Sequence, residues 1–134
     1  MKKILLDTNF LLIPWQFKVD IFTQIDKISA FKYGLFIIDK TLDEIKKIVE
    51  EQKGKDKDAA KFALKLIALK NIGVIKTEEG GETDEIILKT ASKDDFIVAT
   101  QDKDLKRRLI NQGVSVIILR QKKTLAIIND KGFN

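Results

Sequence analysis

Short apolar runs alternate with longer amphipathic segments along the chain, and this alternation constrains the fold more than any other feature. The apolar runs span residues 3–6, 35–38, 74–75, 96–99 and 114–119. They lack the apolar–polar alternation of half-exposed strands, which is typical of strands buried on both faces. The segments with helical spacing span residues 19–29, 41–51, 59–70, 83–92 and 102–112. The pattern predicts an α/β fold: a three-layer α/β/α domain around a mostly parallel sheet of about five strands.

The length of 134 residues suits one domain, and no linker or repeat divides the chain. We therefore expect a single domain over residues 1–134, with its core in about 3–120. Residues 54–58 are polar and predict a break between two helices, and residues 121–134 predict a basic tail with little structure. No apolar run approaches the roughly 18 residues of a membrane span, which predicts a cytoplasmic protein with no membrane partner.

The sequence contains neither histidine nor cysteine. This excludes a Ser–His–Asp triad, zinc sites built from imidazole or thiolate, and a cysteine nucleophile. An enzyme made from this chain must use carboxylates, amines, hydroxyls, the backbone, or a metal ion held by oxygen atoms.

Acidic residues follow the predicted strands. They are Asp7 after the first strand, Asp39, Asp43 and Glu44 after the second, Asp84 before the fourth, and Asp102 and Asp104 after it. In parallel sheets ligands bind at the carboxyl ends of the strands, so we expect these acids to share one edge. Two such charges 4 Å apart repel by roughly 4 kcal/mol, which a bound cation would relieve. Oxygen-only ligands select Mg²⁺ or Mn²⁺, ions suited to phosphoryl chemistry.

Three of these acids also have ordinary structural explanations. Thr41 and Glu44 have the spacing of a helix capping box. Asp102 stands where a helix N-cap is preferred, and Asp84 lies in a first helical turn. Asp7 has no such explanation, because it ends a buried apolar strand.

Basic residues are concentrated near the C-terminus of a chain whose net charge is +5. Between residues 103 and 123 the only acid is Asp104, and the basic residues are Lys103, Lys106, Arg107, Arg108, Arg120, Lys122 and Lys123. The asymmetry favours a polyanionic partner, although a solvated helix face with a lysine-rich tail would look the same.

Four stretches together resemble the PIN-domain ribonucleases in order and spacing, over residues 3 to about 120. They are Ile4-Leu5-Leu6-Asp7-Thr8-Asn9, Leu42-Asp43-Glu44, Thr83-Asp84-Glu85-Ile86-Ile87 and Val98-Ala99-Thr100-Gln101-Asp102-Lys103-Asp104-Leu105. The chain looks closest to the archaeal single-domain members, which are similar to the PIN nucleases of small-subunit ribosomal RNA processing. The resemblance implies a doubly wound fold, an acidic pocket that binds Mg²⁺ or Mn²⁺, and hydrolysis of RNA.

The resemblance also implies roles for individual residues. The implied catalytic acids are Asp7, Glu44, Asp84 and Asp102. Metal ligands would come from Asp7, Asp84 and Asp102, with Asp104 as an additional acid that some members use. Thr8, Asn9 and Thr100 would orient the acids or water. Two choices stay open: Glu85 could replace Asp84, and Asp43 competes with Glu44, from which it points about 100° away on a helix.

The expected function is metal-dependent endonucleolytic cleavage of RNA, in ribosomal RNA processing. One alternative is a toxin ribonuclease of the VapC kind with an antitoxin partner, and another is a non-catalytic RNA-binding assembly factor. A signalling domain of flavodoxin type is a more distant alternative, because Lys76 rather than an acid follows the third strand. A homodimer is a further expected partnership. Phe10, Trp15 and Phe17 could stack on bases, or could belong to the core or to a dimer contact.

Overall fold

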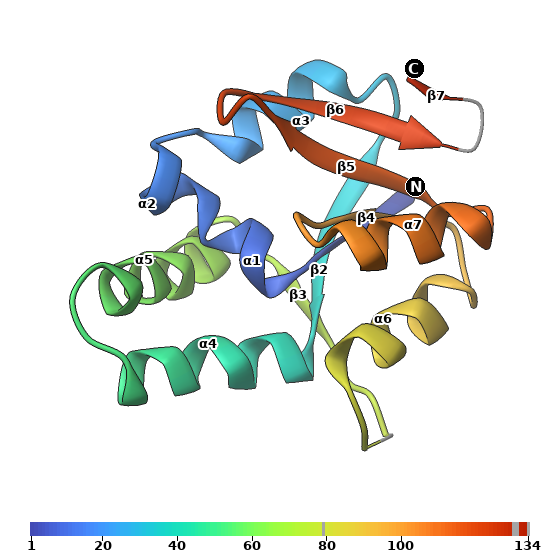
Figure 1. Cartoon of the computed structure of the whole chain (residues 1–134). Helices are drawn as coiled ribbons and strands as arrows, with labels where there is room; N and C mark the ends of the chain where they lie inside the picture. The colour runs from blue at the N-terminus through green and yellow to red at the C-terminus, as the bar shows by residue number, and fades with distance from the viewer. Residues whose placement is uncertain (79, 130–131, 134) are drawn as a thin grey trace.

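The computed structural model describes residues 1–78 and 80–129 and the backbone of residues 132–133. It is a three-layer α/β/α structure with one sheet in the middle (Figure 1). The strands are β1 (Lys2–Leu6), β2 (Tyr33–Ile38), β3 (Gly73–Ile75), β4 (Phe96–Ala99), β5 (Ser115–Arg120), β6 (Thr124–Asn129) and β7 (Gly132–Phe133). The helices are α1 (Thr8–Leu11), α2 (Ile13–Phe17), α3 (Ile21–Ile28), α4 (Asp39–Glu51), α5 (Lys55–Leu69), α6 (Thr83–Ala91) and α7 (Lys103–Asn111). No helix in the described part of the chain is both long enough and apolar enough to cross a membrane.

The strands lie in the order β3-β2-β1-β4-β5-β6-β7. Strands β1 to β5 are parallel, and β6 and β7 are antiparallel to their neighbours. From β1 the chain moves outward through β2 and β3, then returns to place β4 on the other side of β1. The topological switch point therefore lies between β1 and β4, and such a point is where open α/β sheets bind ligands.

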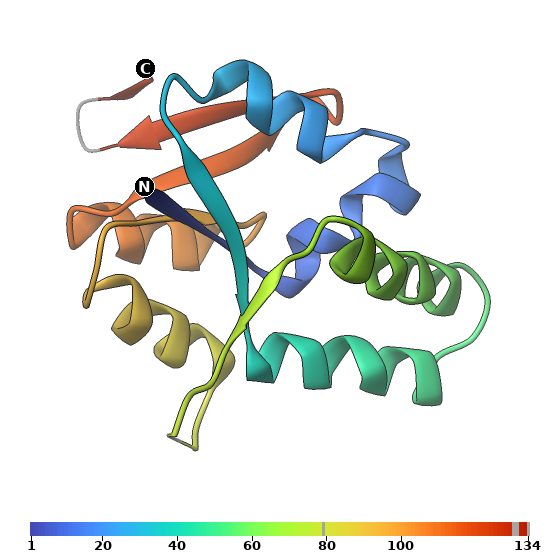
Figure 2. The same cartoon turned by 180° about the vertical axis from the view of Figure 1, so that it is seen from behind.

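Successive residues of each central strand face opposite layers. Ile4 and Leu6 pack in a core with α1 to α5, whereas Leu5 packs in a second core with α6 and α7. Figures 1 and 2 show these two groups of helices on either side of the sheet. Both faces of β1 are thus buried, which explains why its sequence is apolar without alternation. The predicted α/β class and mostly parallel sheet are confirmed.

The structure differs from the predicted helices in three places. Residues 8–17 form α1 and α2, two short helices whose four and five residues are too few to show a periodic pattern. Residues 55–58, predicted as a break, are the first turn of α5, where Asp56 and Asp58 favour the positive end of the helix dipole. Helix α4 begins at Asp39 rather than near Thr41.

The largest difference is at the C-terminus, where the sequence predicted a tail. Residues 124–129 instead form β6, whose Leu125 and Ile127 are buried against the layer of α1 to α5. The sheet accordingly has two strands more than expected. Gln121 and Lys122 form the turn between β5 and β6, both with positive φ angles, of 52° and 56°. The prediction failed because this turn carries none of the glycine or asparagine residues that usually mark a hairpin. Residues 130, 131 and 134 of the predicted tail lie outside the described residues.

Candidate active site

A cavity of about 520 Å³ opens at the carboxyl edge of the sheet, beside the switch point. Its lining residues come from four segments of the chain. They are Asp7, Thr8, Asn9, Leu12, Glu44, Lys47, Ile48, Glu51, Gln52, Thr83, Asp84 and Asp102. The structure thus brings together the four predicted catalytic acids, which lie far apart in the sequence, and places Thr8 and Asn9 beside them.

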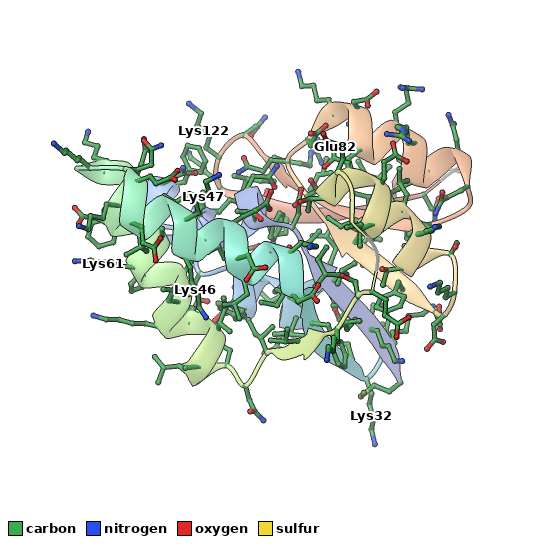
Figure 3. The ribbon with its side chains drawn as sticks, turned by 90° about the horizontal axis from the view of Figure 1, so that it is seen from below. Lys32, Lys46, Lys47, Lys61, Glu82 and Lys122 are labelled. Atoms are coloured by element: carbon green, nitrogen blue, oxygen red, sulfur yellow. The ribbon has the colours of Figure 1, made fainter. Side chains whose placement is uncertain are left out.

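Lys47 is the one positively charged residue among the described residues that line this cavity, and sequence analysis missed it. It lies three residues after Glu44 on α4, a spacing that places both side chains on the same face of a helix. That spacing was the available signal. Figure 3 shows Lys46 and Lys47 projecting from different sides of α4.

Asp7 is the most buried acid of the site, with 6 % of its surface exposed. It follows β1 directly and caps α1, accepting a 2.8 Å hydrogen bond from Thr8 N on Oδ1. Thr100 Oγ1 donates to Asp7 Oδ2 at 2.7 Å. Burial raises the pKa of Asp7 to about 6, against the lowering effect of these two hydrogen bonds and with a further rise from Asp84 and Glu44. Such a perturbed buried acid in a cavity is typical of a functional site.

Thr100 and Asn9 connect the end of β4 to the start of α1. The hydroxyl of Thr100 donates to Asp7 and accepts a 3.1 Å hydrogen bond from Asp102 N. Asn9 Oδ1 accepts from Gln101 N at 3.1 Å, and Gln101 Nε2 donates to the Asn9 carbonyl at 3.0 Å. Thr100 and Asn9 therefore fix the loop before α7 relative to Asp7, and their orienting role in a reaction stays a prediction.

Glu44 is held by two threonine hydroxyls from other helices. Thr8 Oγ1 donates to Oε1 at 2.5 Å and Thr83 Oγ1 donates to Oε2 at 3.0 Å. The capping-box explanation is wrong, because α4 begins at Asp39 and Thr41 lies buried inside the helix. Asp43 is exposed, so Glu44 is the acid that faces the cavity. Sequence analysis did not identify Thr83 as a partner of Glu44.

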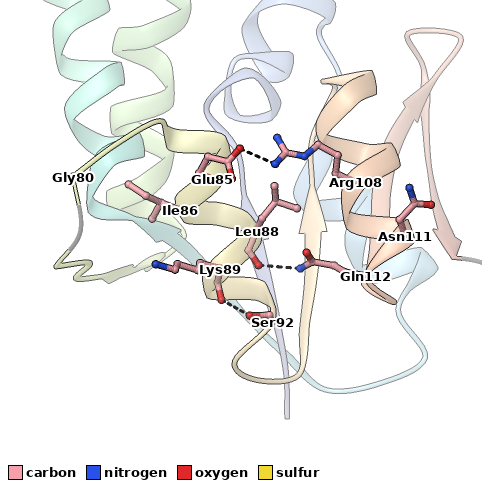
Figure 4. A pocket seen from close by; sticks show the side chains of 9 residues that line it. All are labelled: Gly80, Glu85, Ile86, Leu88, Lys89, Ser92, Arg108, Asn111 and Gln112. Atoms are coloured by element: carbon pink, nitrogen blue, oxygen red, sulfur yellow. Dashed lines mark hydrogen bonds and ion pairs between the residues drawn. The ribbon is translucent and has the colours of Figure 1, made fainter.

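Asp84 lines the cavity from the first turn of α6 and is half-buried. Burial raises its pKa, and Asp102 raises it further, whereas Arg108 lowers it. The neighbouring Glu85 points elsewhere: it forms a 2.7 Å ion pair with Arg108 in a groove between α6 and α7 (Figure 4). Of the two acids left open by the sequence, Asp84 is the one at the cavity.

Asp102 both caps a helix and lines the cavity. Its Oδ1 accepts a 3.0 Å hydrogen bond from Leu105 N, which makes it the N-cap of α7, as the structural explanation expected. Asp104 is not among the lining residues. Asp104 lies two residues after Asp102, which turns its side chain by about 200° around the helix axis. Its exposed carboxylate pairs with Arg107 at 2.5 Å. The structure therefore does not bring Asp104 to the predicted metal site.

The acids and hydroxyls that line the cavity offer only oxygen atoms as ligands, which fits a hard divalent cation. One of these acids, Asp7, has a raised pKa. Within the described residues, no three of the acids already meet in the arrangement of a metal site.

The predicted basic residues separate into two groups. Lys103, Lys106, Arg107 and Arg108 lie on α7, where both arginines form ion pairs with acids. Lys122 and Lys123 lie at the hairpin that follows β5, whose last residue is Arg120. The C-terminal basic window is thus divided between α7 and the β5–β6 hairpin.

A family model described as a PIN like domain matches residues 4–122. The chain belongs to the PIN-like domain family. Ribonuclease VapC4 of Methanocaldococcus jannaschii is 30 % identical over 128 residues, which cover 95 % of this chain and 97 % of that protein. Ribonuclease VapC9 of Archaeoglobus fulgidus is 33 % identical over 122 residues, which cover 90 % of this chain and 85 % of that protein.

Solved structures support the same fold. The PIN domain endonuclease Utp24 has a TM-score of 0.75 at 20 % identity, covering 93 % of this chain and 90 % of that one. A domain of a functionally unknown protein from Methanocaldococcus jannaschii has a TM-score of 0.65 at 19 % identity, covering 90 % and 92 %. The family predicted from sequence is confirmed, and with relatives of this kind the chain is identified as a nuclease of the PIN-like family.

Proposed function

We propose that the chain is a divalent-metal-dependent endoribonuclease that hydrolyses RNA phosphodiesters at the cavity around Asp7. The observation that carries the proposal is the gathering of Asp7, Glu44, Asp84 and Asp102 from four separate elements at the switch point of the sheet. The names of the curated relatives, both ribonucleases, support RNA as the substrate.

Mg²⁺ or Mn²⁺ is the proposed cofactor, and Asp7, Asp84 and Asp102 are the residues that would hold it. When bound, such an ion lowers the pKa of a water molecule and stabilises charge on the reacting phosphate. Burial, with a smaller contribution from neighbouring acids, raises the pKa values of Asp7 and Asp84, and this supports the assignment because a bound cation stabilises the charged form of a carboxylate.

The remaining residues of the cavity orient the reaction. Glu44, fixed by Thr8 and Thr83, would accept a hydrogen bond from the attacking water and so direct it toward the phosphorus. Lys47 would hold a non-bridging phosphate oxygen of the substrate, and Lys103 and Lys106 would contact the RNA beyond the cavity. Cleavage would leave a 5′-phosphate and a 3′-hydroxyl.

The experiment that tests this function is cleavage of a labelled single-stranded RNA with Mg²⁺, with Mn²⁺ and with EDTA. We expect cleavage with either ion and none with EDTA. The Asp7→Asn variant should be inactive, and the matched Asp43→Asn variant, which changes an exposed acid on α4, should be active. Full cleavage in EDTA would exclude the metal, and RNA binding without cleavage under all conditions would favour the assembly-factor alternative.

A specific observation favours a toxin-type role over ribosomal RNA processing. The curated relatives at 30 % and 33 % identity are both named VapC, whereas the likeness to Utp24, at 20 % identity, supports the fold alone. A toxin-type ribonuclease should arrest growth when expressed alone and should be relieved by a small antitoxin encoded beside its gene. Normal growth on induction, together with accumulated ribosomal RNA precursors on deletion, would instead favour the processing role.

A further inference from the structure

A second hollow of the surface lies away from the cavity, where the turn from α2 to α3 meets the tip of the β5–β6 hairpin. It has a volume of about 390 Å³. Lys18 and Lys27 line it from one side of the chain, and Lys122 and Lys123 line it from the other. We call this hollow the lysine groove. It joins the two predicted hairpin lysines to two others that are about 100 residues distant in the sequence, so no sequence window could have shown it.

The hairpin tip is fastened to α3 rather than free. Gln24 Nε2 donates to the Lys123 carbonyl at 3.4 Å, and Gln24 Oε1 accepts from Leu125 N at 3.4 Å. Both lysines of the tip are therefore held beside Lys27, which lies on the same helix as Gln24. The groove is a product of tertiary structure and not of a loose basic tail.

Backbone strain is concentrated at this groove. In the described residues four non-glycine positions have positive φ angles: Lys18, Asn71, Gln121 and Lys122. Three of the four are residues of the groove or of the hairpin turn beside it. Such conformations disfavour L side chains, and they are retained mainly where the surroundings or a function require them.

Aromatic rings lie next to the lysines. Lys122 Nζ is 5.6 Å from the centre of the Phe17 ring, which lines the groove, and Lys18 Nζ is 3.9 Å from the centre of the Trp15 ring. Both rings are half-buried, so each keeps an accessible part. Lysines beside partly accessible aromatic rings are typical of sites that hold a single strand by its phosphates and stack on its bases.

The acid within the groove does not neutralise these lysines. Asp20 accepts hydrogen bonds from Phe22 N, Thr23 N and Thr23 Oγ1 at the start of α3, and these bonds lower its pKa. Within the described residues, none of the four lysines forms an ion pair with a carboxylate. The groove thus carries four lysines against the one carboxylate of Asp20, which leaves a positive balance for a polyanion.

We propose that the lysine groove is a second RNA-binding site, which holds the backbone of a single-stranded segment while Phe17 stacks on a base. The inference rests on the proposed ribonuclease function, because it extends the substrate path of that cavity. Asp7 and Phe17 are ten residues apart along two short helices, α1 and α2, and a helical rise of 1.5 Å per residue makes this path roughly 15 Å long. One strand can therefore reach both sites.

The first test compares two variants with equal changes in charge. The groove variant carries Lys18→Gln, Lys27→Gln, Lys122→Gln and Lys123→Gln. The control variant carries Lys32→Gln, Lys46→Gln, Lys61→Gln and Lys65→Gln, all exposed lysines outside the groove, of which Figure 3 labels Lys32, Lys46 and Lys61. Binding of a single-stranded RNA of roughly 16 nucleotides is measured in EDTA at several salt concentrations.

We expect the groove variant to lose affinity for this RNA. The slope of log K against log salt should fall by about 0.7 for each phosphate that the protein no longer neutralises. The control variant should keep the slope of the parent. Equal slopes in the two variants would overturn the proposal. Because binding in EDTA requires no catalysis, this result is independent of whether the parent cleaves RNA.

The second test separates the groove from the cavity. The groove variant should cleave a dinucleotide at the rate of the parent, since a dinucleotide is too short to span both sites, but should cleave the long RNA with a raised KM. If the parent protein does not cleave RNA at all, the proposed function is wrong, and the binding result in EDTA is unaffected. A groove variant with unchanged KM on the long RNA would overturn the groove as a substrate site.

A third test uses the strained turn. Gln121→Asn with Lys122→Gly supplies the residues that this turn prefers and should raise the melting temperature while lowering affinity for the long RNA. Gln121→Asn alone should raise the melting temperature and leave affinity intact. The proposal is wrong if removal of Lys122 together with Phe17→Leu leaves RNA affinity unchanged.

Discussion

The hydroxyl of Thr100 donates a 2.7 Å hydrogen bond to Asp7 Oδ2, and both side chains are buried. The two residues follow β4 and β1, the strands on either side of the switch point. The same hydroxyl accepts from Asp102 N, and of its two possible acceptors Asp7 Oδ2, at 2.7 Å, is nearer than Asn9 Oδ1, at 3.5 Å. This bond fixes Asp7 in the one place where both halves of the sheet contribute to the site.

Removing that bond should shift the pH dependence of the enzyme. The Thr100 hydroxyl lowers the pKa of Asp7, so in Thr100→Val the pKa should rise above about 6. The acid limb of the pH–rate profile should then move to higher pH. The variant should also lose about 1–3 kcal/mol of unfolding free energy, because a buried acceptor loses its partner. Thr100→Ser keeps the hydroxyl and should leave the profile in place; an unshifted profile in Thr100→Val would contradict the prediction.

Asp7 itself should make the metal-free protein less stable as the pH rises. Its pKa is about 6 in the folded protein against an ordinary 3.8, so the folded state binds the proton more tightly. The stability that this group contributes is present below pH 3.8 and is lost as the pH passes 6. A shift of this size corresponds to about 3 kcal/mol at neutral pH.

Asp7→Asn should therefore raise the unfolding free energy at pH 7 in EDTA. One lost hydrogen bond costs about 1 kcal/mol, which leaves a gain of roughly 2 kcal/mol. Urea unfolding at pH 4 and pH 7 measures this directly, and Asp43→Asn is the exposed control. Added Mn²⁺ should raise the melting temperature of the parent and leave that of Asp7→Asn unchanged. A destabilised Asp7→Asn at pH 7 would show that the acid is stabilising where it stands.

The central part of the site could be predicted from the sequence because its signals are local. Asp7 follows one apolar strand directly. Asp102 lies between a second apolar strand and the helix after it. Each position is fixed by one strand–helix junction, and the topology of a parallel sheet brings such junctions to one edge. The sequence left open whether Glu44 or Asp43 faces the site, and the structure decides it by showing which face of α4 lines the cavity.

Two of the missed features depend on contacts between distant segments. The hydrogen bond from Thr83 to Glu44 joins α6 to α4, and the hydrogen bond from Gln24 to the Lys123 carbonyl joins α3 to the hairpin. Neither pair has a spacing that a single sequence can show. The hairpin itself was missed because Gln121 and Lys122 adopt its turn without the usual residues, and because tertiary burial of Leu125 outweighs the weak local pattern.

Glu44→Gln should separate charge from structure. The amide oxygen can still accept from one threonine and its NH₂ can donate to the other, so we expect the unfolding free energy to change by less than about 1 kcal/mol. Loss of this charge should weaken metal binding and abolish most cleavage. The substitution should also lower the pKa of Asp7, because the charge of Glu44 raises it. This shift is opposite in direction to the one expected in Thr100→Val. Nuclear magnetic resonance titration in EDTA measures the shift; cleavage at the parent's rate would remove Glu44 from the site.

Asp102→Asn tests an acid that has two roles. Asparagine caps a helix about as well as aspartate, so α7 should persist and stability should stay close to that of the parent. Metal affinity should fall, and the pKa of Asp84 should move down toward its ordinary value, because Asp102 helps to raise it. Asp102→Ala, in contrast, should lose the cap as well, at about 1 kcal/mol. If Asp102→Asn binds Mn²⁺ and cleaves RNA as the parent does, Asp102 is a helix cap alone.

Lys47→Gln should show whether the cavity holds substrate through a cation. Lys47 lines the cavity among five acids, and Lys46, its neighbour on α4, is exposed and does not line it. If Lys47 binds a phosphate in the ground state and the transition state alike, KM should rise about tenfold with kcat nearly unchanged, equivalent to about 1.4 kcal/mol. Metal affinity should stay the same or tighten, because a repelling charge has gone. Lys46→Gln makes the same change in net charge and should keep the parent's KM. An unchanged KM with tighter Mn²⁺ binding in Lys47→Gln would mean that the lysine only offsets the acids around it.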